Sequence, residues 1–162
     1  MNELIILVAF TLDNQKYALH LSAVETIIQA VEFTALPKAP KIVNGIVNFH
    51  GKIIPVFNIR KRFNLPDKEI DLDDHLIIVH TSKRMAALIK DNVSNVISRS
   101  KEEIINANKI LPEIKYIEEI LRLKNGIMLI YILIHNLDKF LSLEEEKELE
   151  NSMKGNISGI FF

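Results

Sequence analysis

The chain repeats one order of short strands and turns, and this internal repeat limits the folds that are open to it. Residues 10–27 (FTLDNQKYALHLSAVETI) resemble residues 79–96 (VHTSKRMAALIKDNVSNV), and residues 42–63 resemble residues 116–141, each pair offset by about seventy residues. Gly51 and Gly126 lie at matching hairpin tips in the second pair. One half of the chain buries little apolar surface by itself. The repeat therefore predicts two small barrels, of roughly five strands each, that pack against each other.

The clearest single motif is residues 42–63, IVNGIVNFHGKIIPVFNIRKRF. Two apolar runs flank the turn pair His50-Gly51, which predicts a β-hairpin with His50 exposed at its tip. Pro55 lies inside the second run. Because proline has no amide donor, its strand is expected at a sheet edge or with a bulge. Exposed edges are places where other proteins attach, so the motif is a candidate binding surface.

The remaining apolar runs are short, rich in isoleucine and valine, and separated by turn residues, which is typical of an all-β protein. The predicted strands are residues 4–12, 16–21, 42–49, 53–59, 76–80, 85–90, 93–97, 116–123 and 127–134. Helix is expected for one turn at 22–28 and at 60–64. A longer helix is expected at 136–150, where Leu137, Phe140 and Leu141 recur at helical spacing.

These patterns predict an all-β fold with a C-terminal helix, in one domain over residues 1–150. The first barrel would take about residues 11–66. The second would take about residues 75–135 together with the N-terminal strand. The helix at about 136–150 and a C-terminal tail at 151–162 complete the chain, and the acidic segment 65–74 (LPDKEIDLDD) would link the barrels.

Composition excludes several classes of protein. The formal net charge of −1 gives no overall attraction to nucleic acid or to an anionic membrane. The absence of cysteine excludes disulfides, thiol catalysis and cysteine-bound metal. The N-terminal segment carries Glu3 and no basic residue, unlike a signal peptide. The longest apolar run, 127–134, has eight residues, against about 20 for a membrane helix. We therefore expect a soluble, cytoplasmic protein.

The five histidines form no familiar metal or catalytic pattern, because none belongs to an i, i+4 pair with an intervening glutamate. His20 and His80 fall in strand-like runs, where a packed or half-exposed histidine is the ordinary case. Asp71, Asp73 and Asp74 have the spacing of a calcium loop, but the central glycine and the terminal glutamate are missing. No cofactor, metal site or catalytic residue is therefore predicted, and the protein is not expected to be an enzyme.

Two further features leave alternatives open. The basic cluster Arg60-Lys61-Arg62, near Phe57 and Phe63, is either a solvated turn or a surface for a partner. A small β-barrel that binds nucleic acid through this cluster is the alternative function. The apolar residues within 24–37 either fill the barrel cores or line a groove between barrels, and such grooves bind helices well.

Residues 36–65, LPKAPKIVNGIVNFHGKIIPVFNIRKRFNL, are similar to the signature segment of the CheW family. These are the adaptor proteins that couple chemoreceptors to the histidine kinase CheA in bacterial chemotaxis. The matching residues in this segment are Leu36, Pro37, Pro40, Gly45, Asn48, Gly51, Pro55, Val56 and Arg62. Asp91 and Val93 match a second signature, and residues 137–141 (LDKFL) match the end of the domain. The resemblance extends over residues 3–150.

The resemblance implies two intertwined, five-stranded SH3-like barrels without enzymatic activity. It implies two partners: the regulatory domain of a CheA-type histidine kinase, bound through exposed barrel ends, and the cytoplasmic tip of a methyl-accepting chemoreceptor, bound in the groove between the barrels. Such a protein would be cytoplasmic and associated with membrane-bound receptor arrays. The residues expected at the binding surfaces are Val24, Glu25, Ile27, Gly45, Asn48, His50, Gly51, Pro55 and Arg62.

The chain departs from the family pattern at several positions. The family's arginine before the hairpin glycine is His50 here, and its aspartate after the Pro-Val motif is Asn58. The glutamate expected near the receptor groove is replaced by Thr26, with Glu25 displaced by one position. Glu119 stands where a glycine is common in the second half. His50 is the departure that lies at the tip of the signature hairpin.

Overall fold

The computed structural model describes residues 3–29, 33–69, 73–90, 95–125 and 128–160. The strands in it are β1 (Leu4–Leu12), β2 (Gln15–His20), β3 (Val24–Gln29), β4 (Val43–Phe49), β5 (Lys52–Phe57), β6 (His75–His80), β7 (Met85–Lys90), β8 (Asn95–Ser100), β9 (Ile104–Asn106), β10 (Ile117–Asn125) and β11 (Met128–His135). The α-helices are α1 (Ile59–Arg62) and α2 (Leu143–Ile160), and short 3₁₀ turns are η1 (Leu21–Ala23), η2 (Lys101–Glu103), η3 (Ala107–Lys109) and η4 (Leu137–Lys139). The fold is all-β with a C-terminal helix, as the sequence predicts.

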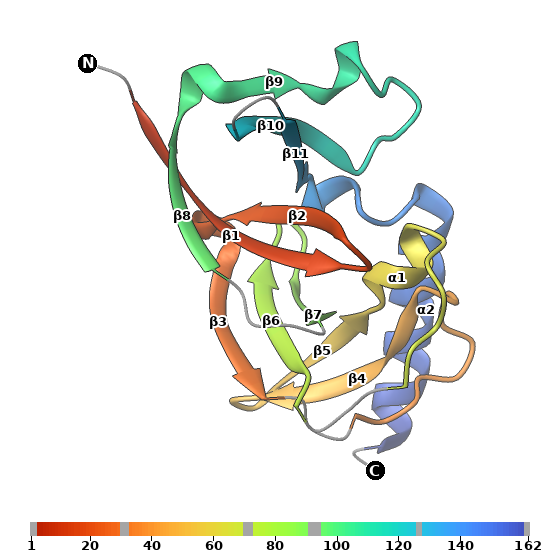
Figure 1. The fold of residues 1–162 in the computed structure, drawn as a ribbon. Helices are drawn as coiled ribbons and strands as arrows, with labels where there is room; N and C mark the ends of the chain where they lie inside the picture. The colour runs from red at the N-terminus through yellow and green to blue at the C-terminus, as the bar shows by residue number, and fades with distance from the viewer. Residues whose placement is uncertain (1–2, 30–32, 70–72, 91–94, 126–127, 161–162) are drawn as a thin grey trace.

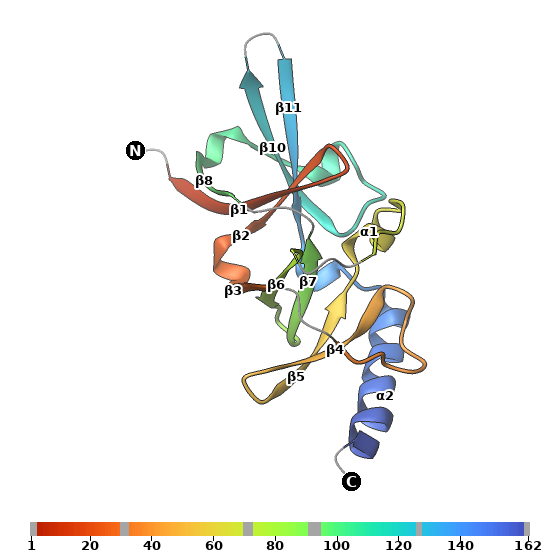
Figure 2. The same ribbon diagram turned by 60° about the horizontal axis from the view of Figure 1, so that its bottom comes forward.

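The strands form two sheets, which Figure 1 shows one above the other. Within the described residues, the upper sheet has the order β8-β1-β2-β11-β10-β9 and the lower sheet the order β3-β6-β7-β5-β4. Helix α2 lies beside β4 in both Figure 1 and Figure 2. Below, barrel 1 means the sheet that begins with β3, and barrel 2 means the sheet that begins with β8. This arrangement is consistent with two SH3-like barrels, and β9 adds a sixth strand to barrel 2.

The two halves of the chain exchange their first hairpins. Strands β1 and β2, from the first half, pair with β8 and β11, whereas β6 and β7, from the second half, pair with β3 and β5. The predicted assignment of residues 11–66 and 75–135 to separate barrels was therefore wrong in detail. The reason is that each barrel is completed by one antiparallel and one parallel strand pair to the other half, and such long-range pairs leave no mark on local sequence.

Each exchanged hairpin is held at its turn by the other barrel's chain. Arg60, in α1, donates two hydrogen bonds to the Asp13 carboxylate in the β1–β2 turn, at 3.0 and 3.1 Å. At the corresponding place in the second half, Asp138 in η4 accepts bonds from the Ser82 amide (2.8 Å) and hydroxyl (3.0 Å) in the turn between β6 and β7. These two hydrogen-bonded contacts, called clasps below, join the barrels to each other.

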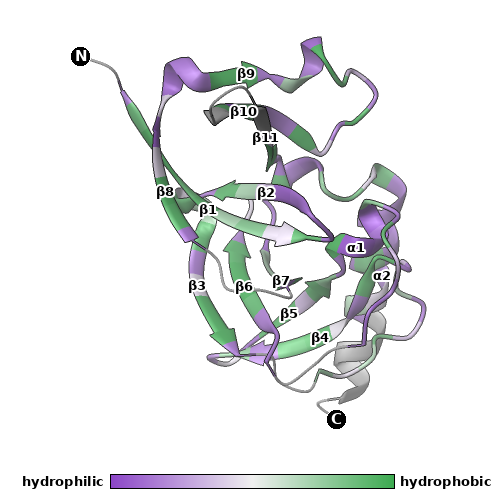
Figure 3. Ribbon diagram, viewed as in Figure 1, coloured by the Kyte–Doolittle hydropathy of each residue, from purple (hydrophilic) through white to green (hydrophobic). Residues whose placement is uncertain are grey.

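The largest apolar cluster lies between the sheets. It contains Tyr17 from barrel 2, Phe57 and Leu88 from barrel 1, and Phe140 and Leu149 from the C-terminal segment, all buried. Figure 3 shows that the strands of both sheets are rich in hydrophobic residues. Because one cluster serves both sheets and α2, the barrels are packed as one unit, which the limited core of each half requires.

The predicted hairpin at residues 42–63 is confirmed, but the position of its second strand is not as expected. β4 and β5 pair antiparallel from Phe49↔Lys52 to Val43↔Phe57. β5 is an interior strand, because β7 pairs with it on the other side. Pro55 is tolerated because that parallel pairing begins only at Val56. The bulge lies instead on β4, where the register shifts between Val43 and Gly45.

Other differences concern element type and bounds. Residues 22–28, expected to be helical, form the end of η1 and most of β3. The helix expected over 136–150 begins at Leu143 and continues to Ile160, through most of the expected tail. A capping box fixes this start, since the Ser142 hydroxyl accepts from the Glu145 amide and the Glu145 carboxylate accepts from the Ser142 amide. Residues 91–94 and the hairpin tip at Gly126 lie outside the described residues.

Candidate functional site

Three of the expected binding residues lie on β3, an edge strand of barrel 1. Val24 is partly buried and packs against the main core, so its role is mainly structural. Glu25 is exposed, with its carboxylate 3.7 Å from Nδ1 of His80 on the neighbouring strand. Ile27 is 38% exposed. Strand alternation thus turns Glu25 and Ile27 outward, on an edge that no other described strand covers.

A second group lies on the β4–β5 hairpin. His50 and Gly51 have φ angles of +51° and +86°, the left-handed pair that a tight type I′ turn requires. The Asn48 side chain holds this turn, because its Oδ1 accepts a hydrogen bond from the Gly51 amide at 2.9 Å. The His50 ring is exposed and stands edge-on to Phe49, with ring centroids 4.3 Å apart. The tip therefore presents His50 and Gly51 to solvent on a fixed backbone, while Pro55 is buried in the strand.

Gly45 has a structural role that its sequence match does not reveal. A Cβ at this position would lie 2.3 Å from the Thr34 carbonyl oxygen. Thr34 and Ile46 exchange two backbone hydrogen bonds, of 2.8 and 2.9 Å, which hold the passing segment against β4. Glycine is needed here because the chain crosses directly over the strand and leaves no room for a Cβ.

Arg62 is turned inward and occupied. Its guanidinium bonds to the Glu145 carboxylate of α2 and lies 5.7 Å from the Tyr116 ring centroid and 5.6 Å from that of Phe140. Partial burial acts to raise the pKa of Glu145, but the hydrogen bond from the Ser142 amide and the charge of Arg62 outweigh it, so the pKa lies below its ordinary value. Arg62 thus connects α1 to α2 and is not on the surface formed by β3 and the hairpin.

The same geometry weakens the case for a basic nucleic-acid patch. The Arg60 side chain is 11% exposed and bonded to Asp13, and the Arg62 side chain is 18% exposed and bonded to Glu145. Lys61 is the exposed member of the cluster. Phosphate binding needs cations that face solvent and can replace counterions, and two of the three here already hold carboxylates. Arg60 and Arg62 therefore stabilise the fold through ion pairs with other segments of the chain.

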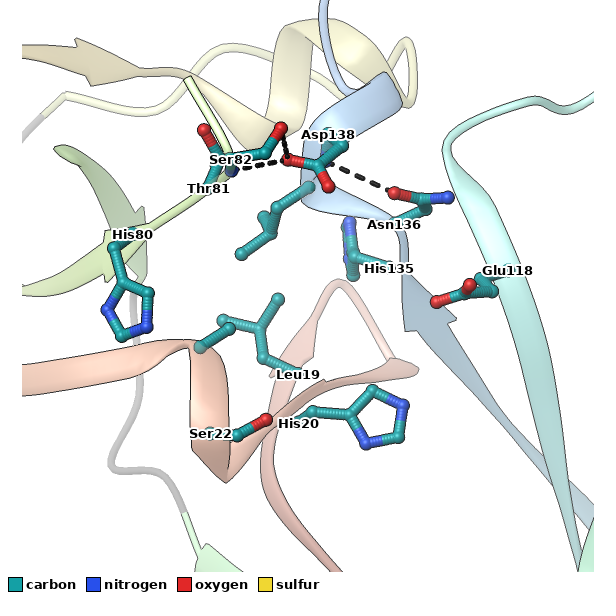
Figure 4. A pocket seen from close by; sticks show the side chains of 12 residues that line it. Leu19, His20, Ser22, His80, Thr81, Ser82, Glu118, His135, Asn136 and Asp138 are labelled. Carbon is teal, nitrogen blue, oxygen red and sulfur yellow. Dashed lines mark hydrogen bonds between the residues drawn. The ribbon is translucent and has the colours of Figure 1, made fainter. Parts of the chain in front are cut away.

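A cavity of about 420 Å³ lies where the two barrels meet. Figure 4 shows its walls, which come from both sheets. The lining side chains are Leu19, His20, Ser22 and Ala23 from the end of β2 and from η1, His80, Thr81 and Ser82 from the end of β6 and its turn, and Glu118, His135, Asn136, Leu137 and Asp138 from β10, the end of β11 and η4. Ala23 directly precedes β3, and His80 in the cavity wall lies 3.7 Å from the Glu25 carboxylate, so β3 begins beside the cavity.

The cavity at the junction of the barrels is called the groove below. A second cavity of about 480 Å³ adjoins it at the end of barrel 2. His20 and Glu118 line both cavities. His20 Nε2 lies 2.7 Å from Oε1 of Glu119, and both side chains are about one-third exposed, at 32% and 29%. Ligand atoms of His20, Glu118 and Glu119 all lie within 4.8 Å of one another. The local sequence around these residues does not predict this grouping.

His135 is the most perturbed titratable group near the groove. It is 3% exposed, and neither ring nitrogen has a hydrogen-bond partner within the described part of the chain. Its ring lies among aromatic side chains, with centroids 5.9 Å from Phe10, 5.5 Å from Tyr17 and 5.1 Å from Phe63. Burial in these apolar surroundings lowers its pKa to about 3, so the ring is neutral near pH 7.

The family model for the CheW-like domain matches residues 7–148. The chain belongs to the CheW-like domain family. The match covers the strands of both barrels from Leu7 onward and the start of α2.

Relatives and solved structures agree with this assignment. The chain is 26% identical over 151 residues to the chemotaxis protein CheW of Treponema pallidum, covering 90% of this chain and 86% of that protein. It is 24% identical over 149 residues to chemotaxis protein CheW of Klebsiella aerogenes, covering 91% and 87%. The structure of the scaffolding protein TtCheW from Thermoanaerobacter tengcongensis superposes with a TM-score of 0.75 at 28% identity, covering 90% of this chain and 91% of that one. Within the described residues, no helix is long and apolar enough to cross a membrane.

The structure brings the predicted residues together only in part. Glu25 and Ile27 share one edge of barrel 1, His50 and Gly51 project at the hairpin tip, and Arg62 packs elsewhere against α2. Sequence reasoning missed the grouping of His20 with Glu118 and Glu119. The paired glutamates were visible, but their common direction depends on a bulge in β10 that the sequence does not signal.

Proposed function

We propose that this protein is a non-catalytic adaptor that couples the cytoplasmic tips of chemoreceptors to a CheA-type histidine kinase. Membership of the CheW-like domain family and the names of its relatives support a role in chemotaxis. The observation that carries the proposal is the groove at the junction of the barrels, flanked by the outward residues of the edge strand β3. The protein would act in the cytoplasm, at membrane-bound receptor arrays.

The groove is the surface proposed for the receptor tip. Its walls mix apolar groups, such as Leu19 and Leu137, with polar groups, such as Ser22 and Asp138. A helix that lays one face on a groove uses side chains at positions i, i+3, i+4 and i+7 as anchors. A cavity of about 420 Å³ accepts a few anchor side chains, and Ile27 on β3 extends the apolar contact. The helical hairpin of a receptor tip fits this pattern.

The end of barrel 1 is the surface proposed for the kinase regulatory domain. The rigid β4–β5 turn presents His50 and Gly51, and Asn48 holds its conformation. A preformed turn loses little conformational entropy on binding, which favours its use as a contact surface. Because the hairpin tip and the receptor groove are formed by different residues, both partners can be bound at once by a single rigid body.

The test is a pair of binding measurements on purified protein. The regulatory domain of the kinase and a soluble fragment of the receptor's cytoplasmic tip are titrated separately by calorimetry, with micromolar affinity expected for each. Ile27→Asp should weaken receptor binding at least tenfold and leave kinase binding unchanged. Ile110→Asp is the matched control, because Ile110 is also an exposed isoleucine, at 52%, and lies in a different part of the surface.

The results separate the possible outcomes. If neither partner binds at micromolar concentrations, the adaptor role is wrong. If Ile27→Asp and Ile110→Asp have equal effects on receptor binding, the region beside β3 is not the receptor surface. Thermal unfolding of each variant shows whether a loss of binding comes from a loss of fold.

A further inference from the structure

A histidine and two glutamates converge at the open end of barrel 2, from strands that are not neighbours. His20 ends β2, Glu118 and Glu119 lie near the start of β10, and β11 runs between those two strands. The His20 imidazole and the Glu119 carboxylate are already in contact at 2.7 Å, and Glu118 completes a set of ligand atoms that lie within 4.8 Å of one another. The three side chains thus bridge β2 and β10 over the end of the apolar core of barrel 2.

A β-bulge places both glutamates in this group. Successive residues of a regular strand point to opposite faces, so adjacent glutamates would normally diverge. The register of β10 against β11 shifts between Ile117 and Glu119, which makes Glu118 the extra residue. Figure 4 shows the Glu118 carboxylate pointing from β10 into the groove. The backbone therefore delivers two carboxylates to one place.

The donor set and the free space suit a divalent cation. Imidazole nitrogen and carboxylate oxygen bind Zn²⁺ at about 2.0–2.2 Å, which puts neighbouring ligand atoms about 3.4 Å apart in a tetrahedral site. The three ligand atoms lie within 4.8 Å of one another, and the His20–Glu119 pair at 2.7 Å would open by less than about 1 Å to reach that spacing. Cavities of about 420 and 480 Å³ lie on either side of His20 and Glu118, so water can reach the remaining coordination positions.

The equivalent end of barrel 1 provides an internal comparison. Ala18 in barrel 2 and Ala87 in barrel 1 are equivalent, because they pair with corresponding residues of β11 and β5. Two residues further along the chain, His20 in barrel 2 is therefore equivalent to Ile89 in barrel 1. The bulge positions likewise correspond, with Glu118 and Glu119 in barrel 2 at the places of Asn44 and Gly45 in barrel 1. The Asn44 and Ile89 side chains face a space of only about 20 Å³. Only barrel 2, among these described ends, has ligands and room together.

A second observation points to a polar ligand in the same cavity. His135 lines the groove with His20 and Glu118, is 3% exposed, and makes no hydrogen bond from either ring nitrogen among the described residues. The corresponding residue of barrel 1 is Phe57, since both residues pair with the first residue of the facing strand. A buried, unpartnered polar ring has a desolvation cost that a ligand or ordered water can remove.

We propose that His20, Glu118 and Glu119 bind one divalent transition-metal cation, for which Zn²⁺ is the best match in donor type. Binding replaces the direct His20–Glu119 contact with a bond from each of the two side chains to the metal. Lys101 lines the adjoining cavity, and its ammonium is 2.6 Å from the Glu3 carboxylate. The bound ion would fasten β2 to β10 at the lip of the groove.

The experiment is calorimetric titration of the purified full chain with ZnCl₂. One equivalent per chain is expected, and thermal unfolding should shift upward with added Zn²⁺, because an ion that binds the folded state stabilises it. The near-isosteric variants Glu118→Gln and Glu119→Gln should each weaken binding at least tenfold, and His20→Gln should abolish it. The matched control is His80→Gln with Glu25→Gln, which removes the His80–Glu25 pair of barrel 1 and should leave binding unchanged.

The proposal is overturned by any of three results. These are no saturable binding up to millimolar Zn²⁺, binding that His20→Gln and both glutamine variants leave intact, or binding that the control variants remove instead. Far-ultraviolet circular dichroism of each metal-free variant shows whether it is folded, and if His20→Gln is unfolded the two glutamine variants decide. No partner protein is used, so the outcome is independent of the proposed adaptor role.

Discussion

In barrel 1 the β4–β5 register shifts at Asn44, and the segment around Thr34 crosses directly over Gly45. In barrel 2 the β10–β11 register shifts at the corresponding residue, Glu118, and a second glutamate occupies the place of Gly45. The β-bulge is at the same place in both halves, but the side chains at and beside it differ. One end is sealed by the crossing chain, and the other remains open, with three ligand-type groups around it.

A second pair of equivalent positions differs in the same direction. Phe57 fills its place in the core of barrel 1, stacked on Phe140 at 5.3 Å, whereas His135 puts an unpartnered imidazole at the corresponding place in barrel 2. The repeat therefore preserves strands and bulges, while the side chains at equivalent positions differ between the two halves. At these equivalent positions barrel 1 has Gly45 and Phe57, and barrel 2 has Glu119 and His135.

The largest expected effect tests the sealed end of barrel 1. Gly45→Ala places a Cβ 2.3 Å from the Thr34 oxygen, so the crossing segment must move and its two hydrogen bonds to Ile46 must weaken. We expect a loss of about 3 kcal/mol in the free energy of unfolding, measured by urea denaturation. Glu119→Ala at the corresponding place in barrel 2 should cost about 1 kcal/mol, the value of the lost hydrogen bond to His20. Equal losses would contradict the difference between the two ends.

The next effect concerns the equivalent positions Phe57 in barrel 1 and His135 in barrel 2. The pKa of His135 is lowered to about 3 in the folded protein, against 6.5 ordinarily. Below pH 6.5 the unfolded chain takes up a proton that the folded chain does not, so the stability present above pH 6.5 is lost as the pH falls towards 3. At pH 4 the loss is about 3 kcal/mol.

His135→Phe should remove this loss, and urea denaturation at pH 7 and pH 4 measures it. The variant should also gain about 1 kcal/mol at pH 7, because no unpartnered polar ring remains buried. The reverse variant, Phe57→His, should introduce acid sensitivity into barrel 1. If the difference in stability between pH 7 and pH 4 is the same for the parent chain and for His135→Phe, the buried imidazole is not its source.

A smaller effect distinguishes the two clasps. Arg60 and Asp138 occupy corresponding places after β5 and β11, and each holds the turn of an exchanged hairpin. Arg60→Ala removes a two-bond guanidinium–carboxylate contact and should cost about 2 kcal/mol, while Asp138→Ala should cost about 1 kcal/mol. Denaturant midpoints of the single and double variants provide the measurement. Losses near zero would show that core packing alone joins the barrels.

Much of the fold is predictable because its strands are locally encoded. The strands 4–12 and 85–90 were predicted with their observed bounds, since apolar runs and turn residues mark both ends. β3 was missed because Glu25 and Thr26 make this edge strand polar. The start of α2 was signalled by Ser142 and Glu145, but apolar spacing at 137–141 suggested an earlier one.

The candidate sites were less predictable because they depend on contacts between distant segments. The hairpin tip at His50 and Gly51 was predicted from local turn chemistry, and the turn is present. The contact of Arg62 with Glu145 spans 83 residues, and the grouping of His20 with Glu118 and Glu119 spans 99. Such contacts follow from the exchange of hairpins and from the bulge in β10, neither of which local sequence determines.

The smallest expected effect compares the two hairpin tips. His50 precedes Gly51 at the β4–β5 tip, and Asn125 precedes Gly126 in the sequence between β10 and β11. His50→Arg adds a permanent cation to an exposed, preformed turn, and we expect about threefold tighter binding of the kinase regulatory domain, a value typical of one rim charge. Asn125→Arg adds the same charge at the second tip and should leave affinity unchanged. Calorimetric titration of both variants decides whether the kinase contact belongs to barrel 1. Equal gains in affinity for the two variants would reflect net charge alone. Unchanged affinity for His50→Arg would place the tip outside the interface.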